Sequence, residues 1–376
     1  MRIRPNNLLL LCMMALMAIL TTSCSKHKIA KKDAIELGAT SMGTKALVTD
    51  EGSFVNLSYT GNKGFGVYGY KKVDNPTGNS TTNTLLFNNI EVKPNENVRE
   101  TTWYYSPLRY WDKNPNASYQ FIAYWPLLPE FGDNLGANET YVSEANKVLT
   151  INRIPNWQPT ATGTDYLLAE PRIGQHVSTT GDPLFGDGKV KFTFSHLLAK
   201  IEVRAYYVGA RQNVYVNVSQ LTLQSPDENN NIVLSSGGTV DVSHDFSQSG
   251  NTNQYGTITS GASKDLMSQP VDLPQTTWFN EAQGGSPTNF QTLCSWLTVP
   301  CNLWNGLDLS VNYTVASTSL TGKATGGLTL DNGQTLPGHS YVITLKITAY
   351  SGIEIESIQV KNWIEGTESN QNVYNW

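Results

Sequence analysis

The chain has 376 residues and a formal net charge of −5 at pH 7, and beyond residue 45 its basic residues are scattered rather than clustered. This distribution excludes the basic surface stripe typical of nucleic-acid-binding proteins, so we expect no nucleic-acid partner. Without an N-terminal signal about 350 residues remain, which is enough for two domains with separate cores.

Residues 1–23 have the order of a secretory signal peptide. Arg2 and Arg4 precede an apolar block that runs from Leu8 to Leu20, and small polar residues follow it. The block is shorter than the roughly 20 residues of a membrane-spanning helix. Cleavage before Cys24 would expose an N-terminal thiol that can be acylated, so the segment resembles a bacterial lipoprotein precursor. An ordinary secreted protein with an incidental cysteine is the alternative.

Residues 24–45 read as a polar, lysine-containing linker, and the first strand or strands are expected within residues 46–59. The apolar anchors of those strands would be Ala46, Val48, Phe54, Leu57 and Tyr59. The stretch "GNKGFGVYGY" follows. No lysine-serine pair or helix comes after its glycines, so it predicts a glycine-rich strand rather than a phosphate-binding loop.

An aromatic segment occupies the middle of the N-terminal half. It contains Trp103, Tyr104, Tyr105, Tyr110, Trp111, Tyr124 and Trp125. Such side chains can stack on sugars, but they also dominate the packing of β-sandwich cores. We favour packing and keep sugar binding as the alternative.

Period-two alternation of apolar and polar residues indicates an all-β fold. Val190, Phe192 and Phe194 alternate with polar residues, and the alternation resumes after Leu197 and Leu198. Four later stretches read the same way: "NVYVNVSQLTLQS", "LDLSVNYTVAS", "YVITLKITAY" and "GIEIESIQVKNW". A composition shift before Val190 divides the chain into an N-terminal sandwich at 46–185 and a C-terminal sandwich at 186–376.

The sequence offers no catalytic or metal-binding constellation. The five histidines are too scattered for a local metal pair, and His196 is expected to be a core or capping residue. There is no nucleophile elbow, and no choice of two carboxylates as acid and base is supported. We therefore expect neither an enzyme nor a cofactor. Cys294 and Cys301 lie close enough in sequence to form a disulfide in an oxidising compartment, and two free thiols are the alternative.

The assembled motifs resemble those of the fimbrillin family of Bacteroidales, the pilins of type V pili. The resemblance covers nearly the whole chain after the signal peptide. It rests on the lipoprotein signal and on "FGVYGY", "YQFIAYWP", "FTFSHLLAKIEV", "LPGHSYVITLKI" and "IQVKNWIEG" in that order.

The resemblance implies two transthyretin-like Greek-key β-sandwich domains in tandem and a lipidated precursor at the outer membrane and cell surface. It also implies that a trypsin-like protease removes an N-terminal segment that fills a groove in the first sandwich. A strand from a neighbouring pilin subunit then takes its place, because an incomplete sheet binds an added strand. The expected product is a fimbria that serves adhesion, and the sequence does not identify its receptor.

The expected cleavage site departs from that of the best-known members, which are cut after arginine. No arginine lies between Cys24 and Arg99, and Lys45 followed by Ala46 stands where the cleavage site is expected. Either the protease accepts lysine, or the segment is retained and the chain is a tip or anchor subunit. A lipidated surface glycan-binding protein is the competing class.

Overall fold

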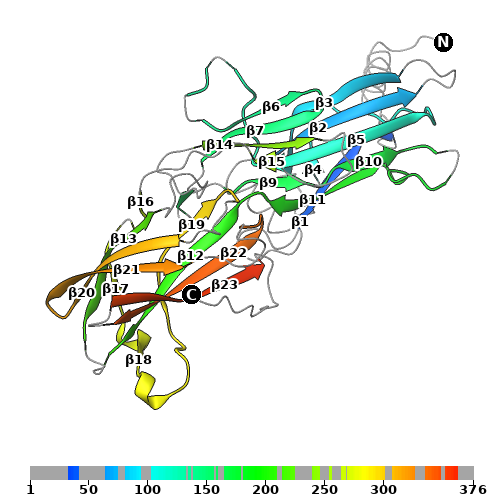
Figure 1. Ribbon diagram of the computed structural model, residues 1–376. Helices are drawn as coiled ribbons and strands as arrows, with labels where there is room; N and C mark the ends of the chain where they lie inside the picture. Colours follow the sequence, from blue (N-terminus) through cyan, green and yellow to red (C-terminus); the bar gives the residue numbers. More distant parts are fainter. Residues whose placement is uncertain are drawn as a thin grey trace, which may run out of the picture.

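The computed structural model describes most of the chain as strands joined by turns. It describes residues 33–41, 64–74, 81–94, 103–132, 134–136, 139–155, 158–159, 165–178, 181–209, 214–224, 239–245, 254–255, 264–267, 269–300, 307–326, 335–348 and 352–362. Within these ranges, the 3-10 helices Gln275–Thr277 and Glu281–Gln283 are short interruptions. The all-β prediction is confirmed, and Figure 1 shows two β-sandwiches in tandem.

The N-terminal sandwich consists of an eight-stranded sheet, called sheet I, and a four-stranded sheet, called sheet II. Sheet I has the order β1-β11-β9-β5-β2-β3-β4, with β10 also paired to β5. Its strands are β1 (Glu36–Ser41), β2 (Phe65–Asp74), β3 (Thr81–Pro94), β4 (Trp103–Tyr104), β5 (Ala117–Trp125), β9 (Leu167–Ala169), β10 (Arg172–Gln175) and β11 (Lys189–His196). Sheet II contains β6 (Tyr141–Ala145), β7 (Val148–Pro155), β14 (Thr239–Asp245) and β15 (Gln254–Tyr255).

The first six residues of β2, Phe65 to Tyr70, are all buried, so both faces of the strand are covered there and simple alternation is absent. Phe65 and Val67 belong to one apolar cluster, whereas Tyr68 and Tyr70 belong to a second cluster that includes residues of sheet II. Because both faces carry large aromatic rings, β2 needs positions without a side chain. A Cβ on Gly66 would lie 2.5 Å from ring atoms of Tyr124 on β5. The glycine-rich strand is therefore confirmed, with a packing role for its glycines.

We expect Gly66→Ala to destabilise the protein by about 1–3 kcal/mol, the usual cost of overpacking a core. Tyr124 is fully buried and its hydroxyl donates to Asn89, so the ring cannot move aside easily. Gly38→Ala is a matched control, because a Cβ on Gly38 of β1 would meet no atom within 4 Å. Chemical denaturation of both variants checks the difference, and equal midpoints would contradict it.

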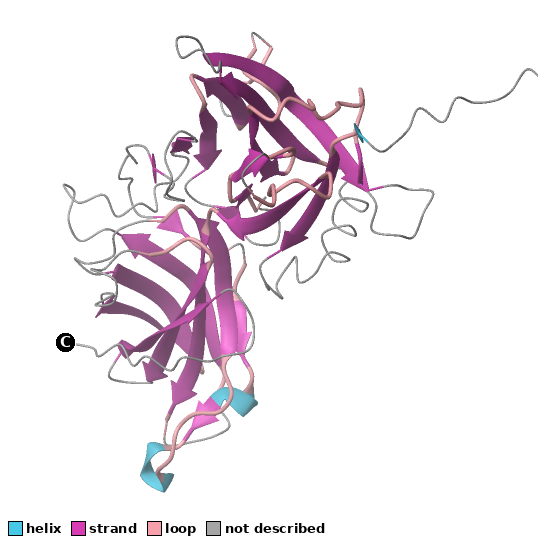
Figure 2. Cartoon of the chain, turned by 90° about the vertical axis from the view of Figure 1, so that its right-hand side faces the viewer, coloured by secondary structure: helices cyan, strands magenta, loops and turns pink. Residues whose placement is uncertain are grey.

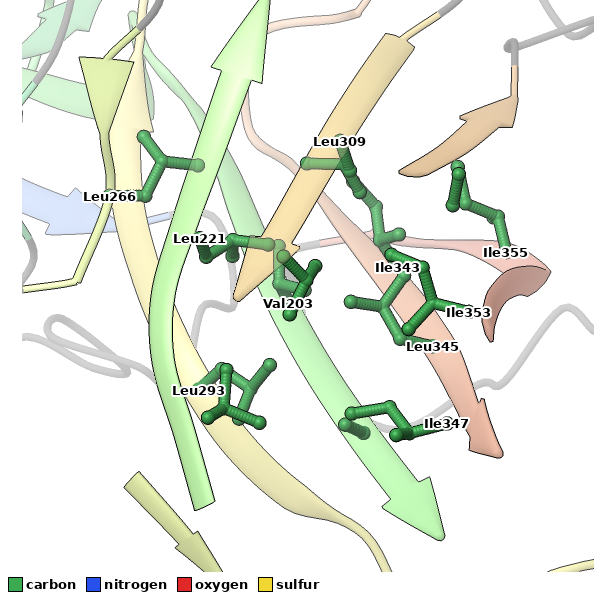
Figure 3. Close-up of a cluster of buried hydrophobic side chains, with 14 of the residues drawn as sticks. Val203, Leu221, Leu266, Leu293, Leu309, Ile343, Leu345, Ile347, Ile353 and Ile355 are labelled. Atoms are coloured by element: carbon green, nitrogen blue, oxygen red, sulfur yellow. The ribbon is translucent and has the colours of Figure 1, made fainter. Parts of the chain in front are cut away.

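The C-terminal sandwich consists of a six-stranded sheet and a five-stranded sheet, called sheets III and IV. Sheet III contains β8 (Gln158–Pro159), β12 (Ala199–Val208), β18 (Trp278–Phe279), β19 (Gln291–Thr298), β22 (His339–Thr348) and β23 (Gly352–Asn362). Sheet IV contains β13 (Val216–Gln224), β16 (Lys264–Asp265), β17 (Val271–Leu273), β20 (Leu307–Val315) and β21 (Thr318–Gly326). The aliphatic core between these sheets, drawn in Figure 3, includes Val203, Leu221, Leu309, Ile343 and Ile355.

The division between the sandwiches differs from the predicted one at residues 185 and 186. β11 pairs with β9 and β1 and so belongs to sheet I, and the chain enters sheet III only after Leu197 and Leu198. β14 later returns to pair with β7 of the N-terminal sandwich, and β8 pairs with β19 of the C-terminal one. Alternation identifies a half-buried strand, but it does not reveal which sheet the strand joins.

The passage between the sandwiches is buried. Leu197, Leu198, Leu297 and Val299 share an apolar cluster with residues of sheets I and II. His196, at the end of β11, places its Nδ1 2.5 Å from Oδ2 of the buried Asp165. The prediction that His196 is a core residue is confirmed. Figure 2 shows the two sandwiches turned by 90° from the view of Figure 1.

Candidate functional site

The N-terminal segment contributes a strand to sheet I. β1 runs parallel to β11 in continuous register, from Glu36 opposite Lys189 to Ser41 opposite Phe194. This strand lies within residues 24–45, a stretch whose sequence predicts a polar linker. The expected first strands at residues 46–59 lie outside the described residues.

The residues just before β1 are bonded to a second part of the N-terminal sandwich. The Ile35 amide donates to the Arg109 carbonyl at 2.9 Å, and the Trp111 amide donates to the Asp33 carbonyl at 2.9 Å. On the β11 side, the Glu36 amide donates to the Gly188 carbonyl at 3.0 Å. The segment therefore lies between β11 and residues 109–111. We call the position occupied by residues 33–41 the β1 groove.

Alternate side chains of the segment fill the core of the N-terminal sandwich. Ile35, Leu37 and Ala39 are 1%, 7% and 1% exposed, and they share an apolar cluster with Phe192 and Phe194 of β11. Burial of one large aliphatic side chain contributes about 1.5–3 kcal/mol. Without the segment, β11 would present unpaired backbone groups beside an open apolar floor, which is the arrangement that accepts an added strand.

One buried hydroxyl fixes the backbone of the segment. Tyr105 donates to the Ile35 carbonyl at 2.7 Å. Desolvation raises the pKa of the Tyr105 hydroxyl above its ordinary value, so the group stays protonated and remains a donor at neutral pH. Tyr105 thus satisfies a carbonyl that water does not reach.

We expect Tyr105→Phe to loosen the segment by about 1–3 kcal/mol, because the buried Ile35 carbonyl loses its donor. Hydrogen exchange of the residue 33–41 amides should become roughly ten- to hundredfold faster, in line with that free energy. Tyr104→Phe is the matched control, since Tyr104 is 46% exposed. Unchanged protection in Tyr105→Phe would show that the bond does not hold the segment.

The aromatic segment is mainly packing. Tyr105, Trp111, Tyr124 and Trp125 are buried, and Trp103 is half-buried. Tyr104 and Tyr110 are each 46% exposed. Trp111 stacks on His176 and Phe185 rather than on open space. The packing interpretation is confirmed, and these buried rings lie beside a groove that the chain itself fills.

The remaining predicted site residues are mostly beyond the described part of the chain. Cys24, Lys45, Ala46 and Cys301 lie outside it. Cys294 lies on β19 opposite Val203 and packs, half-buried, against the C-terminal core. The pairing of the two C-terminal cysteines therefore stays a prediction.

A cavity of about 330 Å³ opens on the outer side of sheet III. Its lining includes Tyr206, Lys346, Glu281, Glu354 and Glu356. The charges pair with one another: the Lys346 ammonium lies 2.5 Å from Glu281 and 3.5 Å from Glu354, and Tyr206 donates to Glu356 at 2.9 Å. The hydrogen bond to Glu281 is the main cause of the raised pKa of Lys346. These charged and polar side chains therefore already have partners within the cavity.

The described ranges lack two further features. No helix there has the length and apolar character needed to cross a membrane. No group of three or more His, Cys, Asp or Glu side chains there is arranged to hold a metal ion.

The chain is an all-β protein of two tandem sandwiches, and the first sandwich is completed by a strand from the N-terminal segment. The model of the fimbrillin-like family matches residues 44–363. The chain belongs to the fimbrillin-like family, a family of fimbrial and adhesion proteins. No curated protein matches the chain.

Solved structures match the chain at low sequence identity, and the first of the three described here shares its fold. A fimbrial protein from Bacteroides vulgatus is 15% identical with a TM-score of 0.54, over 88% of this chain and 99% of that one. A proposed cell adhesion protein from Bacteroides ovatus is 14% identical with a TM-score of 0.47, over 89% and 99%. The tip fimbrial protein Mfa3 from Porphyromonas gingivalis is 11% identical with a TM-score of 0.30, over 79% and 94%.

Proposed function

We propose that this chain is a structural subunit of a type V fimbria, exported as a lipoprotein and polymerised by strand exchange after proteolysis. The observation that carries the proposal is β1. A short segment upstream of Lys45 is bonded on two sides and inserts Ile35, Leu37 and Ala39 into the first core. Its loss would open a site shaped for another strand.

The order of events follows from the position of the segment. Cys24 holds the precursor at the outer membrane while residues 33–41 fill the β1 groove. A protease then cuts after Lys45 and detaches the segment together with its lipid. A strand from a neighbouring subunit enters the groove, and repetition of this step builds the fimbria on the cell surface.

A tip or anchor subunit that keeps its N-terminal segment is the second candidate. The observation in its favour is the lysine at the expected cleavage position, where the best-known relatives have arginine. A glycan-binding role for the aromatic segment has less support, because most of its rings are buried.

Lipidation has its own test. We expect Cys24→Ala to abolish labelling of the precursor with a radioactive or clickable fatty acid and to release it from the membrane fraction, since this thiol is the proposed acylation site. Cys294→Ala is the matched control and should be labelled like the unmodified protein. Full labelling of Cys24→Ala would rule out the lipoprotein proposal.

A further inference from the structure

The charges of residues 33–41 are concentrated at one end. Asp33 and Glu36 are the only ionisable side chains of the segment, and the residues from Leu37 to Ser41 carry none. Both carboxylates meet lysines. Asp33 Oδ2 lies 3.1 Å from Lys113 Nζ, and Glu36 Oε2 lies 3.9 Å from Lys189 Nζ.

The two lysines come from opposite sides of the β1 groove. Lys113 follows residues 109–111, which bond to the start of the segment, whereas Lys189 begins β11. Lys191, also exposed, lies opposite Gly38, which offers it no carboxylate. The N-terminal end of the segment therefore lies between two lysines, and its remaining residues, 37–41, carry no charge.

Nearby carboxylates offset this positive charge only in part. Asp112 accepts a hydrogen bond from Lys71 at 2.9 Å, and that bond is the main cause of its lowered pKa. The carboxylate of Asp187 accepts from the Lys189 amide at 3.0 Å. If residues 33–41 left, Lys113 and Lys189 would lose their partners, and the groove entrance would gain two net positive charges.

Apolar alternation and backbone bonding do not by themselves fix how a new strand enters. An added strand can bond to an edge in either direction, and a shift by two residues keeps the same face inward. The alternate spacing of Ile35, Leu37 and Ala39 is the same in either direction, so only the small size of Ala39 distinguishes the two ends. A charged end breaks this symmetry, because only a parallel strand in one register brings its carboxylates to both lysines.

We infer that the β1 groove selects a strand of defined chemistry from a second polypeptide. The strand runs parallel to β11 and carries two carboxylates three residues apart at its beginning, around the first of its apolar anchors. Ion pairs with Lys113 and Lys189 select the direction and register of the strand. Packing in the core selects the order of its buried side chains, which is large, large, small. This inference rests on the proposed strand exchange.

The expected size of the effect follows from exposure. Lys113 and Lys189 side chains are 77% and 52% exposed, so each ion pair alone contributes little. Reversing both charges replaces two attractions by two repulsions, and such changes act strongly on association rate and on discrimination between partners. At low salt we expect the double charge reversal at Lys113 and Lys189 to weaken binding of a strand with the sequence of residues 33–41 roughly five- to tenfold.

The experiment uses the full chain cleaved after Lys45 by trypsin or, if trypsin cuts elsewhere, by a sequence-specific protease whose site replaces Lys45. The probes are two fluorescent peptides: residues 33–41 as they stand, and the same peptide with Asp33→Lys and Glu36→Lys. Both are titrated into the cleaved protein, its Lys113→Glu/Lys189→Glu variant, and a Lys72→Glu/Lys323→Glu control. The control changes net charge equally, at exposed lysines away from the groove.

The unmodified peptide should bind the cleaved protein and the control more tightly, and the preference should invert in the Lys113→Glu/Lys189→Glu variant. The preference should also shrink as salt rises from about 50 to about 500 mM, where exposed charges are screened. Equal binding of both peptides to the cleaved protein would overturn the inference and leave strand exchange standing. Binding of neither peptide to cleaved protein from which the detached segment has been removed would overturn both. Because the two peptides are compared on cleaved protein without substitutions at Lys113 and Lys189, this part of the test does not depend on whether a protein variant folds.

Discussion

Cleavage of the folded precursor after Lys45 should convert a monomer into concentration-dependent oligomers. Residues 33–41 would then be held only by non-covalent contacts, and a strand from another copy could compete for the β1 groove. We expect limited trypsin treatment to cut at Lys45 before most later lysines, because lysines within paired strands are protected by the fold. Mass spectrometry identifies the cut, and light scattering follows assembly.

A truncation after Gly366 is the informative companion to this experiment. If the C-terminal stretch ending at Trp376 supplies the incoming strand, the truncated chain should be cleaved normally and remain monomeric. Ile35→Ala should have the opposite effect, since a smaller anchor in the segment favours its release and speeds assembly. A cleaved full-length chain that stays monomeric would favour the tip or anchor role.

Phe65→Ala should produce the largest loss of stability among single substitutions in the first sandwich. Phe65 is fully buried on β2, and its ring lies edge-on to Trp103, Phe192 and Phe194 at centroid distances of 5.1, 5.9 and 5.5 Å. Removing the ring leaves a cavity among rigid aromatics, which costs about 3–5 kcal/mol. That is a large share of a typical total stability of about 5–15 kcal/mol.

Phe131→Ala is the matched control for this prediction. Phe131 is 68% exposed and contacts mainly Tyr141, so its removal should change the free energy of unfolding by less than about 0.5 kcal/mol. Urea denaturation followed by tryptophan fluorescence compares the two variants. Similar midpoints for Phe65→Ala and the unmodified protein would contradict the packing described for β2.

Strands of the C-terminal sandwich that have one buried and one exposed face could be predicted from sequence. On β12, Ile201, Val203 and Ala205 are buried, while Glu202 and Arg204 between them are partly exposed. The alternation carries the full structural signal in such a strand. In the first six residues of β2, by contrast, both faces are buried, so the glycines and aromatics predict a strand but do not predict its two-sided packing.

β1 could not be predicted in the same way because it is short and lies in a polar, lysine-rich region. Its signal is only Ile35, Leu37 and Ala39 at alternate positions, and its stability depends on contacts with residues far away in sequence. The hydrogen bonds to Arg109 and Trp111 illustrate this. Resemblance to a family predicted that an N-terminal segment fills a groove, and only the structure identified the residues that do so.

The most direct test of the account is a peptide map of the polymer on native cells. Filaments are isolated with an antibody against this chain, checked by electron microscopy with the same antibody, and digested with a protease that does not cut at lysine. Exchange of β1 predicts labelled filaments whose subunits begin at Ala46 and lack residues 33–41. Filament subunits that retain residues 33–41, or a surface with no labelled filaments, would contradict it.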